Sequence, residues 1–387
     1  MRIHPLHIFG LLLIGACQTI QFDQPLSTSE LDWLVDGQSQ ERTRIYDLNA
    51  SLPLELEWEY NAAAAFGPGS PLILDGVVLA ATRKGEVHTV DLQTGRKRGF
   101  KSFSDGIEGP LAIANGKMFV ASALGKKKLI AWNLRRGNAL WKYKGAAFES
   151  GLVVFENLVI GSDVDGVVTA FDQDSGLVVW SLKLGEMVSV QSTPLLLSGG
   201  RLFVADDASN AFLIAAATGD VLWERRLPGP VYESASASAG RIFVPTTRGV
   251  LVALDEQSGH EIWTLTHDLN TARFGAVATD GERVFVGATD GQLRAIDATN
   301  GEVVWNTIFP DVIAAAPLIA GDVVFVGSMG KMLYGVNRKT GALEWHTELK
   351  GRVKSAIAAS SSGIIVLSEP RYISYFKSLE GPDAEKE

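Results

Sequence analysis

The sequence predicts an all-β protein, an eight-bladed β-propeller, from three observations. A short pattern recurs in which Asp or Asn is followed four residues later by Gly and, after four more residues, by Trp, as in Asp297–Trp305. These repeats, together with Trp58 and Phe100, are spaced 39–43 residues apart, and a fixed period of this size indicates an array of small supersecondary units. Each period also contains short apolar runs separated by glycine turns, which is typical of antiparallel β-strands.

Composition and charge narrow the class of protein. The chain has 387 residues, of which 46% are hydrophobic, and the repeat predicts one quasi-symmetric body rather than several domains. A net charge of −9 argues against nucleic acid or an anionic membrane surface as a partner. Lys126–Lys128 is interpreted as a solvated turn. The single cysteine, Cys17, excludes a disulfide within the chain and a cysteine metal site.

Residues 1–16 read as a signal peptide. Arg2 precedes the apolar run Ile8–Ile14, which is far shorter than the roughly 20 residues that span a bilayer. Small residues then lead directly into Cys17, the arrangement of a bacterial lipoprotein signal, and we expect Cys17 to carry the lipid anchor. The alternative is an ordinary secretory signal cut near Ala16. Similarity to sorted lipoproteins implies that Gln18, in place of aspartate, directs the chain to the outer membrane of a Gram-negative cell.

Residues 17–53 are predicted to be the lipidated cysteine and a flexible tether that holds the body away from the membrane. The segment is mostly polar and shows no strand periodicity. Ser27–Glu30 has the form of a capping box, which predicts one short helix ending near Val35.

Residues 54–380 are predicted to form the propeller, and residues 381–387 a disordered tail. Eight fourth-strand positions and eight three-strand groups can be counted. The last group, residues 356–376, has no fourth strand after it, and Trp58 has no three strands before it. The strand Leu54–Tyr60 should therefore complete the final blade and close the ring, which leaves no open sheet edge.

The repeated residues have structural functions in this interpretation. Asp or Asn accepts backbone N–H groups in the turn, and Gly adopts a positive φ at low cost. Trp offers the largest apolar surface together with an N–H donor, and it should wedge between neighbouring blades. A tryptophan that contacts a cofactor is the alternative, but the regular spacing favours packing. The blade tryptophans are Trp58, Trp141, Trp180, Trp223, Trp263, Trp305 and Trp345.

Two resemblances follow from these motifs. The stretch Gly166–Trp180 resembles the repeats of propellers that bind pyrroloquinoline quinone (PQQ), and the likeness extends over about residues 56–376. With the lipoprotein leader and eight blades, the chain resembles the BamB family. That resemblance implies a non-catalytic, periplasm-facing scaffold without a cofactor, monomeric within a hetero-complex. It also implies that the chain binds the POTRA domains of BamA and other Bam subunits and aids insertion of outer-membrane β-barrel proteins.

A PQQ-binding dehydrogenase is the alternative, because quinoprotein dehydrogenases use the same blades. Resemblance to them implies a vicinal cysteine pair, a calcium site and a catalytic aspartate, and a chain with one cysteine lacks the first of these. Asp163–Gly166 and Asp172–Asp174 look like fragments of a calcium loop without its distal glutamate, and we interpret both as hairpin turns. We expect no catalytic residue, cofactor or metal. A propeller lipoprotein with another envelope partner remains a third reading.

Candidate partner contacts lie in the connections between blades. Residues 181–193 form the longest connection, in which Met187, Val188 and Val190 stand among polar residues. These side chains make a contact patch, or Val188 and Val190 begin the next strand. The following connection, Pro228–Glu233, is stiffened by two prolines and ends in an aromatic and an acidic residue. The family resemblance implies that BamA is met at about this place. The candidate residues are Met187, Val188, Val190, Tyr232 and Glu233.

Overall fold

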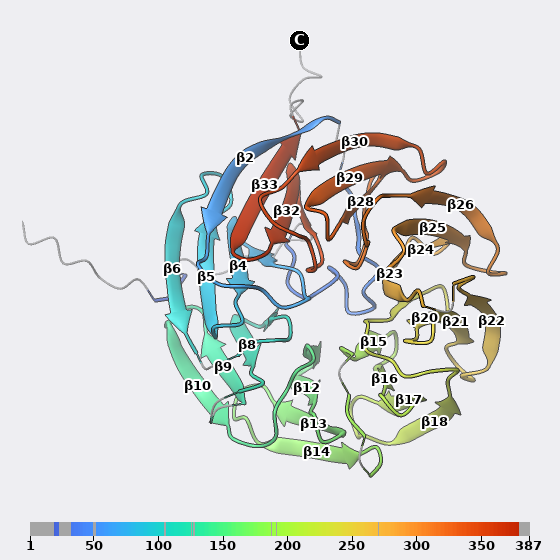
Figure 1. Ribbon diagram of the computed structural model, residues 1–387. Helices are drawn as coiled ribbons and strands as arrows, with labels where there is room; N and C mark the ends of the chain where they lie inside the picture. The colour runs from blue at the N-terminus through green and yellow to red at the C-terminus, as the bar shows by residue number, and fades with distance from the viewer. Residues whose placement is uncertain are drawn as a thin grey trace, which may run out of the picture.

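The chain forms a closed ring of eight antiparallel sheets around a central axis (Figure 1), which confirms the predicted fold. The computed structural model describes residues 19–22, 32–48, 52–103, 106–124, 126, 128–186, 188–190, 192–269 and 271–378. Within these residues there is no helix, and so none that is long and apolar enough to cross a membrane. The predicted signal peptide, Cys17 and the C-terminal tail lie outside the described residues.

Seven blades follow one another along the chain, each with four strands from the axis to the rim. The first three are β3 (Leu72–Leu74), β4 (Val77–Ala81), β5 (Glu86–Asp91) and β6 (Lys97–Ser102); β7 (Ala112–Ala114), β8 (Lys117–Ala121), β9 (Leu129–Asn133) and β10 (Asn138–Tyr143); and β11 (Val153–Phe155), β12 (Leu158–Ser162), β13 (Val167–Asp172) and β14 (Val178–Lys183). The next two are β15 (Leu195–Leu197), β16 (Arg201–Ala205), β17 (Asn210–Ala215) and β18 (Val221–Arg226); and β19 (Ser236–Ser238), β20 (Arg241–Pro245), β21 (Val250–Asp255) and β22 (Glu261–Thr266). The last two are β23 (Phe274–Thr279), β24 (Arg283–Ala288), β25 (Gln292–Asp297) and β26 (Val303–Ile308); and β27 (Leu318–Ala320), β28 (Val323–Gly327), β29 (Met332–Asn337) and β30 (Leu343–Glu348).

The eighth blade closes the ring as predicted. It combines β31 (Ala358–Ser360), β32 (Gly363–Ser368) and β33 (Tyr372–Ser378) from the end of the chain with β2 (Leu54–Asn61) from its beginning. Strand β2 pairs antiparallel with β33. The ring is therefore held shut by main-chain hydrogen bonds between segments more than 300 residues apart in sequence.

The blade tryptophans contact neighbouring blades. In six blades the indole N–H donates to a carbonyl oxygen in the turn before the fourth strand of the next blade, at 2.8–3.1 Å. The motif glycine of that turn packs on the same indole ring; a Cβ at Gly301, for example, would lie 2.8 Å from Trp263. The positive φ of Gly301, 80°, adds a second reason for glycine there. Trp345 instead packs between Phe325 and Phe376.

The blade that lacks tryptophan shows how the missing contact is replaced. Phe100 is 37% exposed and has no indole N–H. The carbonyl of Leu134, which occupies the acceptor position in the next blade, receives the backbone N–H of Phe22 at 2.8 Å. Residues 19–22 fill the space at Gly137 that a tryptophan ring fills at the equivalent glycines, and Trp132 donates its indole N–H to the Ile20 carbonyl at 2.9 Å.

The prediction of a flexible tether is wrong for the described part of residues 17–53. Residues 19–22 dock at the rim as above, and residues 32–48 pack inside the ring with Trp33 fully buried. The predicted helix is also wrong where it can be compared, because residues 32–35 are not helical and Trp33 forms an antiparallel bridge with Ile73. Residues 27–31 of that helix lie outside the described residues. Composition misled here because a segment that lines other strands needs few apolar side chains of its own.

Candidate functional site

Residues 33–48, hereafter the strap, run around the central axis against the innermost strands. Their backbone forms hydrogen bonds in turn with β3, β7, β15, β19, β23 and β27, and the Gln40 side chain donates to the Val154 carbonyl of β11 at 2.9 Å. Near its end the strap becomes β1 (Ile45–Tyr46), a parallel fifth strand beside β27. Innermost strands would otherwise present unpaired N–H and C=O groups to the channel. The strap supplies hydrogen-bond partners to the innermost strands of seven of the eight blades.

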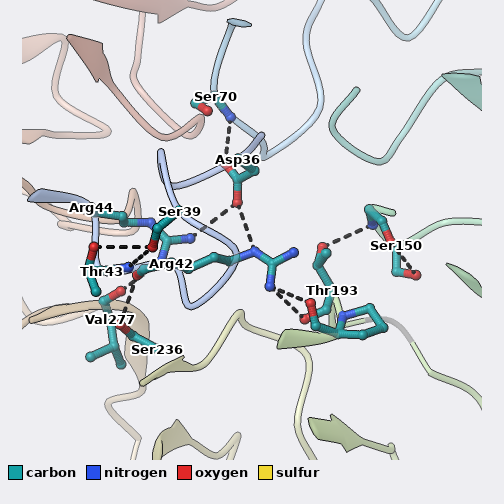
Figure 2. A network of polar contacts seen from close by, with 12 residues as sticks. Asp36, Ser39, Arg42, Thr43, Arg44, Ser70, Ser150, Thr193, Ser236 and Val277 are labelled. Carbon is teal, nitrogen blue, oxygen red and sulfur yellow. Dashed lines mark hydrogen bonds and ion pairs between the residues drawn. The ribbon is translucent and has the colours of Figure 1, made fainter. Parts of the chain in front are cut away.

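A buried ionic cluster fixes the strap across the channel (Figure 2). Asp36 Oδ2 lies 3.5 Å from Arg42 Nε and 3.3 Å from an Arg44 terminal nitrogen, and Asp36 Oδ1 accepts the Ser70 backbone N–H at 2.8 Å. All three charged side chains are at most 5% exposed. One carboxylate therefore bridges two cations from the same short segment and also ties them to the first blade.

The two arginines extend from this carboxylate to two different blades, the fourth and the sixth. Arg42 donates to the backbone carbonyls of Thr193 and Pro194 beside β15, and Arg44 donates to Val277 in β23 at 2.8 Å. The Ser236 hydroxyl of β19 donates to the Arg42 carbonyl at 2.8 Å. Carbonyl acceptors of this kind are well suited to the fixed donor fork of a guanidinium.

Burial changes the ionisation of this cluster. Desolvation lowers the pKa of Arg42 to about 10, although Asp36 opposes the shift, and the pKa of Arg44 is lowered for the same reason. Arginine side chains in proteins stay protonated at neutral pH, so the channel holds two cations that share the Asp36 carboxylate.

The open end, hereafter the channel mouth, is formed by the connections that enter the innermost strands. One cavity there, of about 240 Å³, is lined by residues that include Tyr232, Glu233, Arg273 and Phe274. A smaller, more polar cavity beside it reaches down to Asp36 and Arg44. Desolvation raises the pKa of Glu233, and the Arg44 charge partly offsets this. The mouth thus combines apolar walls with acidic and basic groups on its lining.

The candidate contact residues have different positions in this arrangement. Tyr232, 42% exposed, and Glu233 both line the channel mouth. Val188 and Val190 are 8% and 0% exposed, so the prediction that these two residues form an exposed contact patch is wrong. They also precede β15 rather than starting it, and Val190 packs in the core between two blades. Met187 lies outside the described residues.

The aspartate-rich loops act as turns, as interpreted from the sequence. Asp163 Oδ1 accepts the backbone N–H groups of Asp165 and Val167 at 3.0 and 2.9 Å. Asp172 Oδ1 accepts those of Asp174 and Ser175 at 3.1 and 2.7 Å. Across the part of the chain that the structure describes, no three His, Cys, Asp or Glu side chains gather as metal ligands would.

The ionic cluster was missed by reasoning from the sequence. The segment gave one usable signal, since it contains two large aromatic residues, Trp33 and Tyr46, that a solvated tether has no reason to keep. Their rings pack together with centroids 6.1 Å apart. Asp36, Arg42 and Arg44 could not be paired in advance, because their partners lie in four different blades.

The model of the family described as outer membrane protein assembly factor BamB matches residues 55–164, 164–307 and 247–372. The chain belongs to the BamB family. Its relatives include the BamB of Legionella pneumophila (strain Paris), 27% identical over 193 residues, or 47% of this chain and 49% of that protein. The chain thus matches about half the length of this BamB relative, and about 30% of that of Yersinia pestis BamB, with 30% identity over 118 residues.

Solved structures and one group of enzymes share the fold. The structure of BamB from Moraxella catarrhalis superimposes with a TM-score of 0.69 at 18% identity, over 84% of this chain and all of the other. The quinohemoprotein alcohol dehydrogenase of Comamonas testosteroni gives a TM-score of 0.74 at 14% identity, over 90% and 80% of the two chains. At these identities both superpositions establish the propeller fold alone.

Proposed function

We propose that this BamB-family chain is a non-catalytic scaffold of the β-barrel assembly machinery. It is anchored in the outer membrane through a lipid on Cys17, after removal of residues 1–16, and faces the periplasm. It binds the POTRA domains of BamA and other Bam subunits as a monomer within the complex. In this position it aids insertion of outer-membrane β-barrel proteins.

The observation that carries this proposal is the strap in the channel. In a propeller the axial channel is where convergent loops can enclose a small ligand. Here the chain's own Asp36, Arg42 and Arg44 occupy the channel and are tied to the surrounding blades. A cofactor-dependent dehydrogenase would have to displace a buried ionic cluster, so the geometry favours a scaffold over the enzyme reading that the Comamonas relative raises.

The channel mouth is the surface that we assign to the partner. It lies at the end of the ring where the blade-to-blade connections converge, and it presents exposed Tyr232 beside Glu233. An exposed aromatic side chain at the edge of an apolar cavity is the usual anchor of a protein–protein contact. The strap supports these connections from below, which keeps the mouth rigid before binding.

The test is co-purification from detergent-solubilised envelopes. We expect the tagged wild-type chain to recover BamA, and Tyr232→Ala to reduce this recovery by about tenfold or more, the loss typical of an interface hot spot. The matched control is Leu177→Ala, since Leu177 is 69% exposed in the turn at the opposite end of the ring. Recovery of other envelope proteins without BamA by the wild-type chain contradicts the proposal.

A second prediction concerns the anchor. Cys17→Ala removes the thiol that would carry the acyl chains, and lasting attachment needs more than one chain. We expect the variant to move from the membrane fraction to the soluble periplasmic fraction, measured by immunoblot after osmotic release. Retention of Cys17→Ala in the membrane fraction after a high-salt wash rules out lipidation as the means of attachment.

A further inference from the structure

A basic surface covers the rim of two neighbouring blades. Between Arg96 and Lys144 the sequence contains 12 of the chain's 35 Lys and Arg residues but two of its 44 acidic residues. The stretch therefore carries a formal charge of +10 within a chain of net charge −9. The net charge of the whole chain argued against an anionic membrane surface as a partner. It conceals the local excess of positive charge in residues 96–144.

The fold gathers these charges on the outside of the ring. Strands β6 and β10 are the rim strands of neighbouring blades (Figure 1). Apart from Lys117 on β8, the described basic residues are on these strands, next to their ends or in the loop before β9. Most are exposed side chains, namely Arg96, Lys97, Arg98, Lys126, Arg135, Arg136, Lys142 and Lys144. We call these eight residues the basic rim.

The basic rim is weakly neutralised by the protein itself. Among the described residues, Arg98 is the one member that forms a salt bridge, with Asp91 at 3.0 Å. Lys97 lies over the Phe100 ring at 4.0 Å, and neighbouring Lys101 lies near the Trp132 ring at 5.6 Å. A field of this kind, with cations left to solvent across two blades, attracts a surface of opposite charge.

The N-terminal segment enters the ring at the same place. Residues 19–22 dock in the seam between these two blades through the hydrogen bonds of Phe22 to Leu134 and of Trp132 to Ile20. Cys17 precedes Thr19 by two residues in the sequence, and two residues of chain reach at most about 7 Å. A lipid on Cys17 would therefore emerge beside the basic rim rather than at the end of a long tether.

We propose that the basic rim is the membrane-facing surface of this protein and binds the phosphate groups of anionic lipids. The assignment of the anchor rests on the proposed function; the charge and position of the rim do not. Each Lys or Arg close to an anionic bilayer strengthens binding to it, and a lipid chain beside the basic surface adds the second signal that stable attachment requires. The axis of the ring would then lie along the membrane, with the channel mouth free for a partner.

The experiment uses the full chain with Cys17→Ala in every variant, so that no acyl chain contributes. Flotation with phosphatidylcholine vesicles is compared with flotation with vesicles that also contain phosphatidylglycerol. We expect binding to the anionic vesicles that weakens as salt rises, and a loss of at least about tenfold for Arg135→Glu with Lys144→Glu. Circular dichroism checks that the variants are folded, and Arg136→Gln with Lys126→Gln provides a milder second variant.

The matched control is Lys339→Glu with Lys183→Glu. These residues are exposed at the same turn and strand positions of other blades, Lys339 corresponding to Arg135 and Lys183 to Lys144, and the change in net charge is identical. We expect the control to bind as the parent does. Equal loss in both double variants, equal binding to phosphatidylcholine, or no binding overturns the proposal. The proposal is also overturned if the basic-rim variants bind vesicles as the parent does but no longer bind an acidic protein. Failure to recover BamA would leave these results unaffected.

Discussion

Asp36→Asn is expected to lower the free energy of unfolding by about 3–5 kcal/mol, the cost of removing one partner from a buried ion pair. The amide has nearly the size of the carboxylate but no charge, so Arg42 and Arg44 would remain buried without the carboxylate that both contact at 3.3–3.5 Å. Urea denaturation followed by tryptophan fluorescence should show a lower midpoint for the whole ring, since the strap joins seven blades.

Asp322→Asn is the matched control for this change. Asp322 is exposed and its one described ionic contact is with exposed Lys339 at 3.8 Å, so its loss should alter stability by less than about 0.5 kcal/mol. If Asp36→Asn and Asp322→Asn unfold at the same urea concentration, the strap is not held by the ionic cluster. A drop for Asp36→Asn alone establishes the cluster as the link between strap and ring.

Trp305→Ala is expected to lower the free energy of unfolding by about 3–5 kcal/mol, as other truncations of buried aromatic side chains do. The indole is 9% exposed and contacts Phe285 in its own blade. It also donates to the Arg338 carbonyl of the next blade at 3.0 Å and covers Gly341. The substitution would open a cavity between two blades and leave a carbonyl acceptor without its donor.

The same strand supplies the control for Trp305. Val304 is 47% exposed on β26, so Val304→Ala should change stability by less than about 0.5 kcal/mol. Phe100→Ala adds a comparison at the position that lacks tryptophan, where residues 19–22 make the inter-blade contact instead. A loss at Trp305 no greater than that at Val304 would contradict the wedge function of the blade tryptophans.

Much of the fold could be predicted because its determinants are local and repeated. Glycine at a positive φ, aspartate accepting N–H groups in a turn and tryptophan at the end of a strand each act within a few residues or on the adjacent blade. Trp58 illustrates the reach of this reasoning, since its lack of preceding strands was sufficient to predict its pairing with β33. Eight fourth-strand positions at one spacing left little choice of architecture.

The candidate site was predicted less well. Tyr232 and Glu233 were proposed because they end a connection stiffened by two prolines; both line the channel mouth, and their contact with a partner stays a prediction. Val188 and Val190 were misjudged as available for contact, because a sequence of alternating polar and apolar residues does not reveal which face is covered. Their burial depends on neighbouring blades, with Val188 packed against the loop at Gly166 and Val190 in the core beyond it.

The sequence by itself determined the number of blades, the closure of the ring and the structural function of the tryptophans, because each follows from a period that can be counted. Only the tertiary structure decided what fills the channel and where the N-terminal segment lies. The strap is polar and aperiodic, and its order comes from hydrogen bonds to strands up to 275 residues away, as between Arg44 and Ile319. The same holds for the basic rim, whose charges gather into one surface only when β6 and β10 become the rim strands of neighbouring blades.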